Sequence, residues 1–173
     1  EPENSSTAYT ALWGIEQVLG AEGLKKLAAN VTVSSAASNV VRAVGQGEYA
    51  VGITFESTAY AYIDGGQRDI AIMYPKDGTS VVTDNLVLVK NAPAGPLAKR
   101  LYDLLLSREA QTAVLEAAFR RPSRTDIDVR QYARMPAMVD IKALPTDEDK
   151  AAAERARFIG RWKGYVSAAR NAG

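Results

Sequence analysis

Apolar residues recur three or four positions apart over residues 8–19, which predicts an amphipathic helix there. Residues 21–30 repeat the pattern after Gly20, so a second short helix is expected. The segment 5–7, just before the first helix, reads Ser-Ser-Thr. Hydroxyl residues are favoured at this position because they accept hydrogen bonds from the first backbone N–H groups of a helix. Those N–H groups and the helix dipole can also bind an anion, so the segment predicts either a helix cap or an oxyanion site.

Short apolar runs alternate with helical patterns along the next part of the chain. The runs predicted to be strands are residues 31–33, 49–55, 70–74 and 86–89, of which 49–55 and 70–74 are expected to be buried. Helices are predicted between them, one with an apolar stripe at Val40, Val41 and Val44 and one over residues 56–63. Such an alternation is typical of a parallel α/β sheet.

The pattern changes beyond residue 90. Residues 91–96 are a Pro/Gly/Ala linker, and two helices are predicted after it with no strand between them, the second capped by Ser107. Prolines and charges interrupt every periodicity over residues 119–145, which predicts an extended loop. A long terminal helix is expected from Thr146, and its apolar stripe favours docking on the protein body over lying on a membrane.

Composition excludes several classes of chemistry. The chain has 173 residues, of which 47% are hydrophobic and 24% charged, and its net charge of +1 gives no global field toward nucleic acid. It contains no cysteine and no histidine, which excludes disulfides, a thiolate nucleophile, a Ser-His-Asp triad and a histidine metal site in this chain. We identify no general base, so an enzyme is not expected, and neither a cofactor nor a metal is expected.

Three polar helix starts carry the candidate chemistry: Ser5 to Thr7, Ser34 to Ser38, and Glu56 to Thr58. In open α/β sheets, ligands bind beyond the carboxyl ends of the strands, where helix N-termini converge, so a common crevice is expected. Hydroxyls and backbone N–H groups suit a phosphate, phosphonate, carboxylate or hydrated metal complex, while Glu56 suits an amine, a sugar hydroxyl or a cation. The pattern predicts a binding site without a catalyst.

Five segments, in order, resemble the extracellular solute-binding proteins of bacterial ABC transporters, in the subgroup that spans ferric-ion, phosphonate and sugar-phosphate binders. They are Ser5–Leu12, similar to a Ser-Gly-Thr-Ala helix start with Ser6 in place of glycine; Ala43–Ile53, similar to A-V-x-x-G-E-Y-A-V-G; Tyr74–Thr79, similar to Y-P-x-[DE]-G-T; Leu105–Gln111, similar to L-L-S-[KR]-E-[AG]-Q; and Arg121–Arg124, similar to R-P-x-R.

The resemblance implies an α/β fold in a two-lobed, type II-like clamp that is periplasmic or at the cell surface. The chain looks like the C-terminal half of such a binder, with the N-terminal half on a separate chain or a missing segment. On that basis residues 1–82 are expected in the second lobe, 83–145 in the returning part of the first lobe, and 146–173 in a helix that packs on the lobes. The expected partners are a small anionic ligand, a membrane permease and the N-terminal half.

The resemblance also implies which residues contact the ligand. They are Ser5, Ser6 and Thr7 for the anion, Ser38 before the next helix, and Phe55, Glu56 and Ser57 after the buried strand. Asp77 lies in a Pro/Asp/Gly turn and is expected either to shape that turn or to act as a ligand contact or hinge residue.

An organophosphate or phosphonate is the leading ligand class, because hydroxyl-rich helix starts suit tetrahedral oxyanions. One alternative is ferric ion with a synergistic anion, although Glu56-Ser57-Thr58 stands where ferric binders carry adjacent tyrosines, and Tyr60 and Tyr62 face different directions on a helix. Another alternative is a ligand-sensing module of a signalling system. Arg120, Arg121 and Arg124 could bind an anion through two-pronged hydrogen bonds, but a solvated loop or pairing with Asp126 and Asp128 is the favoured expectation.

Overall fold

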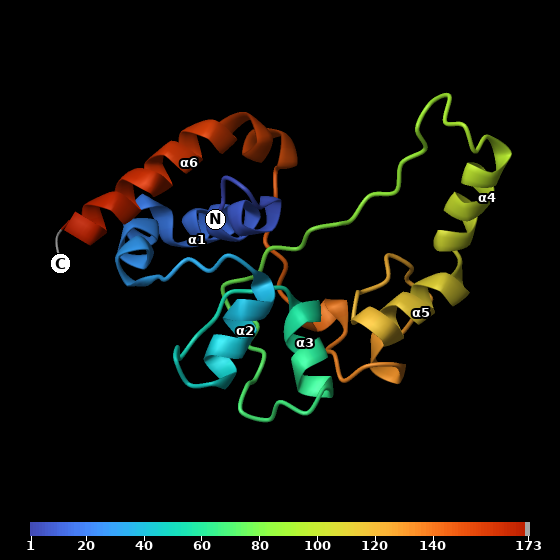
Figure 1. Ribbon diagram of the computed structural model, residues 1–173, viewed down its shortest axis with the longest axis horizontal. Helices are drawn as coiled ribbons and strands as arrows, with labels where there is room; N and C mark the ends of the chain where they lie inside the picture. The colour runs from blue at the N-terminus through green and yellow to red at the C-terminus, as the bar shows by residue number, and fades with distance from the viewer. Residues whose placement is uncertain (172–173) are drawn as a thin grey trace. The chain divides into compact units, whose positions relative to one another are not determined.

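A computed structural model describes residues 1–171, and every helix predicted from the sequence is present in it (Figure 1). The helices are α1 (Ser6–Asn30), α2 (Ala37–Gly45), α3 (Glu56–Asp64), α4 (Pro96–Leu105), α5 (Arg108–Ala118) and α6 (Glu148–Asn171), with short 3-10 helices η1 (Val129–Gln131) and η2 (Met138–Asp140). None of the described helices is long and apolar enough to cross a membrane.

The described residues form two compact units. Unit 1 comprises residues 1–53, residues 73–82 and the described residues from 142 onward, and unit 2 comprises residues 54–72 and 83–141. Unit 1 therefore holds α1, α2 and α6, whereas unit 2 holds α3, α4 and α5.

The core of unit 1 lies between α1 and α6, which run side by side in Figure 1. Phe158 of α6 is completely buried, and its ring meets the edge of Tyr9 with the ring centroids 5.3 Å apart. Trp13 and Trp162 are buried in the same cluster and pack its interior. The apolar stripe of the terminal helix thus packs on α1, which is the docking that its sequence predicts.

Gly20 divides α1 at the position where the sequence predicts a join between two helices. Its backbone angles are φ 67° and ψ −179°, a conformation that other residues rarely adopt. The kink lets both halves of α1 contribute to the core, through Leu12 and Trp13 before it and Leu24 and Ala28 after it.

The core of unit 2 is smaller and lies where α5 meets the loop that follows it. Leu115 of α5 is completely buried and packs with Ile127, Val129 and Met135. Tyr60 of α3 packs against this cluster. The irregular loop predicted over residues 119–145 therefore forms part of the core, because it supplies most of the buried side chains of unit 2.

The predicted strands are not formed in the described residues. Within residues 1–171 the sole β pairing is an isolated parallel bridge between Thr79 and Ala143, so the α/β sheet predicted from the sequence is not confirmed. A strand needs a neighbouring strand to bond its backbone N–H and C=O groups, and none lies beside these runs. Their apolar side chains stay exposed as a result: 72% for Val51, 78% for Val87 and 72% for Val89.

Candidate ligand-binding site

Ser5 caps α1, as its sequence context predicts. Its hydroxyl accepts a hydrogen bond from the backbone N–H of Ala8 at 3.2 Å, and its carbonyl accepts one from the N–H of Tyr9 at 3.0 Å. Ser6 is exposed and Thr7 is half-buried in the first turn. The positive end of the helix dipole is therefore reachable at this point, while the Ser5 hydroxyl already serves the helix.

Helix α6 fixes the segment that leads into this helix start. The Arg155 guanidinium donates to the carbonyls of Pro2 and Glu3 at 3.2 and 3.3 Å, and Lys163 pairs with the Glu3 carboxylate at 3.1 Å. A backbone hydrogen bond to the Glu3 carboxylate, helped by Lys163, lowers the pKa of Glu3. Helix α6 therefore holds the residues that immediately precede Ser5.

Ser38 and Asp77 lie in unit 1, and both side chains are exposed. Ser38 is the second residue of α2, whose N-cap residue Ala36 makes no side-chain capping bond. Asp77 lies in a turn closed by a hydrogen bond from the N–H of Gly78 to the carbonyl of Pro75 at 3.1 Å. The Asp77 segment therefore forms the expected turn. Ligand contact by Ser38 or Asp77 stays a prediction.

Phe55, Glu56 and Ser57 form the start of α3 in unit 2, and all three are half-buried. Glu56 is the first helical residue, where a carboxylate complements the helix dipole. Its two carboxylate oxygens accept from Nε and Nη2 of Arg121, each at 2.7 Å. The Glu56 carboxylate is therefore held in a two-pronged ion pair with an arginine that lies 65 residues away in sequence.

The expectation that the three arginines after α5 are solvated or pair with Asp126 and Asp128 is correct for Arg124 and for the exposed Arg120, and it is wrong for Arg121. Arg124 pairs with Asp126 at 2.8 Å, as expected. Arg121 pairs instead with Glu56, and Arg120 pairs with Asp84 at 2.9 Å. Asp128 pairs with Arg130. The Arg124–Asp126 pair could be predicted because the two residues are close in sequence. The Arg121–Glu56 pair could not, because tertiary packing brings Glu56 from a distant helix.

Arg120 also lies over the ring of Phe55, with the guanidinium carbon 5.6 Å from the ring centroid. Such an arrangement is attractive because the ring face is electron-rich. The two residues that open α3 are therefore each contacted by one of two consecutive arginines. The sequence analysis weighed Arg120 and Arg121 as anion-binding residues but did not predict their contacts with Phe55 and Glu56.

Tyr60 is engaged within unit 2. Its hydroxyl donates to the carbonyl of Arg134 at 2.7 Å, and its ring stacks on Phe119. A tyrosine bound in this way would have to leave both contacts to ligate iron. This arrangement adds to the sequence argument against a ferric site built on Tyr60.

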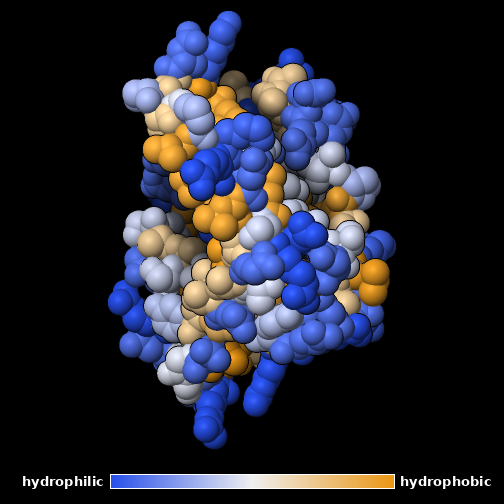
Figure 2. All heavy atoms as spheres, turned by 90° about the vertical axis from the view of Figure 1, so that its right-hand side faces the viewer, coloured by the Kyte–Doolittle hydropathy of each residue, from blue (hydrophilic) through white to orange (hydrophobic). Residues whose placement is uncertain are grey.

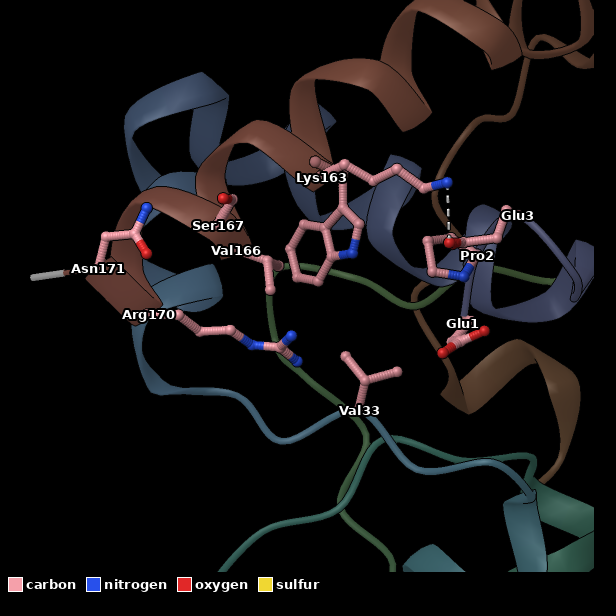
Figure 3. Close-up of a pocket in the computed structure, with 10 residues that line it drawn as sticks. Glu1, Pro2, Glu3, Val33, Lys163, Val166, Ser167, Arg170 and Asn171 are labelled. Atoms are coloured by element: carbon pink, nitrogen blue, oxygen red, sulfur yellow. Dashed lines mark ion pairs between the residues drawn. The ribbon is translucent and has the colours of Figure 1, made fainter. Parts of the chain in front are cut away.

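A cavity of about 280 Å³ lies in unit 1 (Figure 3). It lies between α6, the first three residues and Val33, and the Lys163–Glu3 ion pair closes one side of it. The Arg170 side chain extends along it in Figure 3. None of the eight predicted ligand contacts lines this cavity.

Comparison with known proteins decides the family. The family model of bacterial extracellular solute-binding proteins matches residues 5–141. The chain belongs to this family. The match begins at the capped start of α1 and ends just after η2, so it includes all eight predicted contacts and the arginine segment that holds Glu56. Because the members of this family are extracellular solute-binding proteins, the chain has an extracytoplasmic location.

Curated relatives include proteins of Salmonella typhimurium, Salmonella paratyphi A and Salmonella typhi, each provisionally described as a 2-aminoethylphosphonate-binding periplasmic protein. Each is 33% identical to this chain over 78 residues, which is 43% of this chain and 23% of the relative. The similarity therefore spans about a quarter of the length of these relatives. No solved structure matches the chain.

Proposed function

We propose that this protein is the capture component of an ABC importer and that it binds a small organophosphonate or organophosphate. The capped, hydroxyl-rich start of α1 carries the proposal, because backbone N–H groups and hydroxyls at the positive end of a helix suit a tetrahedral oxyanion. Family membership and the phosphonate-related description of the Salmonella relatives support it.

The proposed contacts follow the residues that the sequence singles out. Ser6 and Thr7 at the start of α1 bind the anionic group, with Ser5 holding the helix end in place. Glu56 at the start of α3 is the proposed contact for a cationic or hydroxyl group of the ligand, because a carboxylate accepts hydrogen bonds from such groups. The protein binds this solute without converting it.

The partners of the proposed function are a membrane permease and an N-terminal half that completes the two-lobed clamp. Closure of the clamp around the solute is the state that the permease recognises. Exposed apolar runs such as Leu86 to Val89 support a missing covering layer, since a run that is apolar on both faces is typical of a strand inside a sheet.

The test is calorimetric titration of the full-length protein with 2-aminoethylphosphonate. Replacing Ser5 and Thr7 by alanine should weaken binding by about 1–3 kcal/mol, since these changes remove a cap and a hydrogen-bonding hydroxyl at the anion contact. Ser107→Ala is the matched control, because Ser107 caps α5 with the same geometry, accepting from the N–H of Ala110 at 3.2 Å.

Ser107→Ala should cost stability and leave affinity unchanged. Equal affinity for the wild type and the Ser5→Ala, Thr7→Ala double variant would remove the α1 start from the site. A visible charge-transfer band with ferric ion, together with no response to phosphonates, would favour the iron alternative.

A further inference from the structure

The cavity in unit 1 is lined by two neighbouring rows of side chains on α6 (Figure 3). Residues four apart on a helix lie on the same face. The first row is Trp162, Val166 and Arg170, and the second is Lys163, Ser167 and Asn171. The first row runs from a buried indole through a half-buried valine to an exposed guanidinium. The cavity is therefore apolar at one end of this row and cationic at the other.

The rest of the apolar lining comes from outside α6. Val33, which follows α1, and the buried Pro2 both line the cavity. Arg155 fixes this part of the lining, because its guanidinium donates to the carbonyl of Pro2 at 3.2 Å. The volume of about 280 Å³ is close to the lower limit for small-molecule pockets, about 300 Å³. The cavity thus suits a small molecule with an apolar body.

Two cations line the cavity, and one of them is not paired. Lys163 pairs with the Glu3 carboxylate at 3.1 Å, and the Glu1 carboxylate accepts from the Asn4 amide at 3.1 Å. The Arg170 guanidinium has no hydrogen-bond or ion-pair partner among residues 1–171. Its side chain extends along the cavity in Figure 3, as expected because long side chains on a helix lean toward its N-terminus. A guanidinium placed in this way can bind a carboxylate through two parallel hydrogen bonds.

The other charges of the lining favour a ligand with a single negative charge. Glu1 and Glu3 also line the cavity, and their carboxylates repel additional negative charge nearby. A carboxylate carries one charge, whereas a phosphate ester carries about 1.5 to 2 near neutral pH. The cavity therefore differs in selectivity from the oxyanion site proposed at the start of α1.

We propose that this cavity is a second binding site, for a small monocarboxylate with an apolar body. The carboxylate pairs with the Arg170 guanidinium. The apolar body lies against Trp162, Val33 and Val166. None of the eight predicted ligand contacts lines the cavity, so this site does not depend on the proposed function.

The experiment is a titration of the full-length protein with benzoate, followed by NMR and by calorimetry. The indole N–H signal of Trp162 should shift. The signal of Trp13, which is buried in the same core but does not line the cavity, should stay. Benzamide has the same body without the charge and should bind about tenfold more weakly, the effect of one lost charge-assisted pair.

Arg170→Ala should weaken benzoate binding by about tenfold and leave benzamide binding unchanged. Arg170→Lys should keep part of the affinity, because lysine retains the charge but not the fork. Arg157→Ala is the matched control, since Arg157 is an exposed arginine of the same helix that does not line the cavity. It should bind benzoate like the wild type. Both arginines are exposed, so neither change removes a core side chain.

Two further outcomes would overturn the site: an unchanged Trp162 signal in the presence of benzoate, or an equal loss of affinity in Arg170→Ala and Arg157→Ala. Displacement of benzoate by 2-aminoethylphosphonate would also overturn it, because the two ligands would then share one site. Benzoate binding as expected, with no binding of 2-aminoethylphosphonate, would support the cavity site and contradict the proposed function alone.

Discussion

Gly78 holds the turn at the Tyr-Pro-Lys-Asp-Gly-Thr segment in a backbone conformation that other residues avoid. Its φ is 128°, and a Cβ added there would lie 2.6 Å from Cδ2 of Leu144. The turn leads directly into Thr79, which exchanges backbone hydrogen bonds with residues 142 and 144 at 2.9 Å each. A single residue without a side chain therefore lets residues 73–82 lie against the segment that enters α6.

Gly78→Ala should lower the free energy of unfolding by about 2–3 kcal/mol, because the substitution adds both backbone strain and a clash with Leu144. Gly47→Ala is the control: its φ of 77° is also positive, but an added Cβ would have no atom within 4 Å. It should cost about 1 kcal/mol from strain alone. Chemical denaturation measures both, and equal losses would mean that the contact with Leu144 does not constrain the turn.

At the scale of elements, local patterns predicted the helices and failed for the strands. Helix α5 follows from a cap at Ser107 and an apolar stripe, both of which lie within its own sequence. A helix bonds its own backbone, so such signals suffice. A strand is completed by another segment, and an apolar run such as residues 49–55 does not say which segment that is. The Glu56–Arg121 pair was missed for the same reason.

The contact between α1 and α6 depends on a buried tyrosine. Tyr9 is 5% exposed, its hydroxyl donates to the carbonyl of Ala151, and Arg155 lies over its ring. Burial raises the pKa of Tyr9 above its ordinary value of 10.0, and the nearby Glu154 adds to the effect. The neutral phenol is thus favoured in the folded state.

Stability linked to Tyr9 should therefore be fully present below pH 10.0 and decrease as the pH rises through the higher folded-state pKa. Tyr9→Phe should lose about 1 kcal/mol at neutral pH, because the hydrogen bond to Ala151 is gone, and should show a weaker decrease in alkali. Tyr49→Phe is the control, since Tyr49 is exposed. Thermal unfolding of the three proteins between pH 8 and pH 11 measures how stability depends on pH. If stability fell equally with rising pH in the wild type and in Tyr9→Phe, the link to Tyr9 would be contradicted.

At the scale of the whole chain, unit 2 exposes apolar residues that a complete fold would cover. Helix α4 contributes no buried residue, although Leu97, Leu101 and Leu104 follow one another at helical spacing. Apolar side chains reach the surface on the face that carries α4 (Figure 2). Lys99 and Asp103 pair with each other on the same helix, whereas its leucines remain exposed. An amphipathic helix with an uncovered stripe needs a further layer.

The proposed N-terminal half supplies that layer, and hydrogen exchange can detect it. In the 173-residue chain alone, the amides of Val87 and Val89 should exchange rapidly, because residues 86–89 have no partner strand in the described structure. Amides of Phe158 and Trp162, in the core helix α6, provide the protected reference. Adding the N-terminal half should slow exchange at Val87 and Val89 and leave the reference unchanged, because new ladder hydrogen bonds form only where strands meet. Slow exchange at Val87 and Val89 in the chain alone would show that this run already has a partner and would remove the need for a covering half.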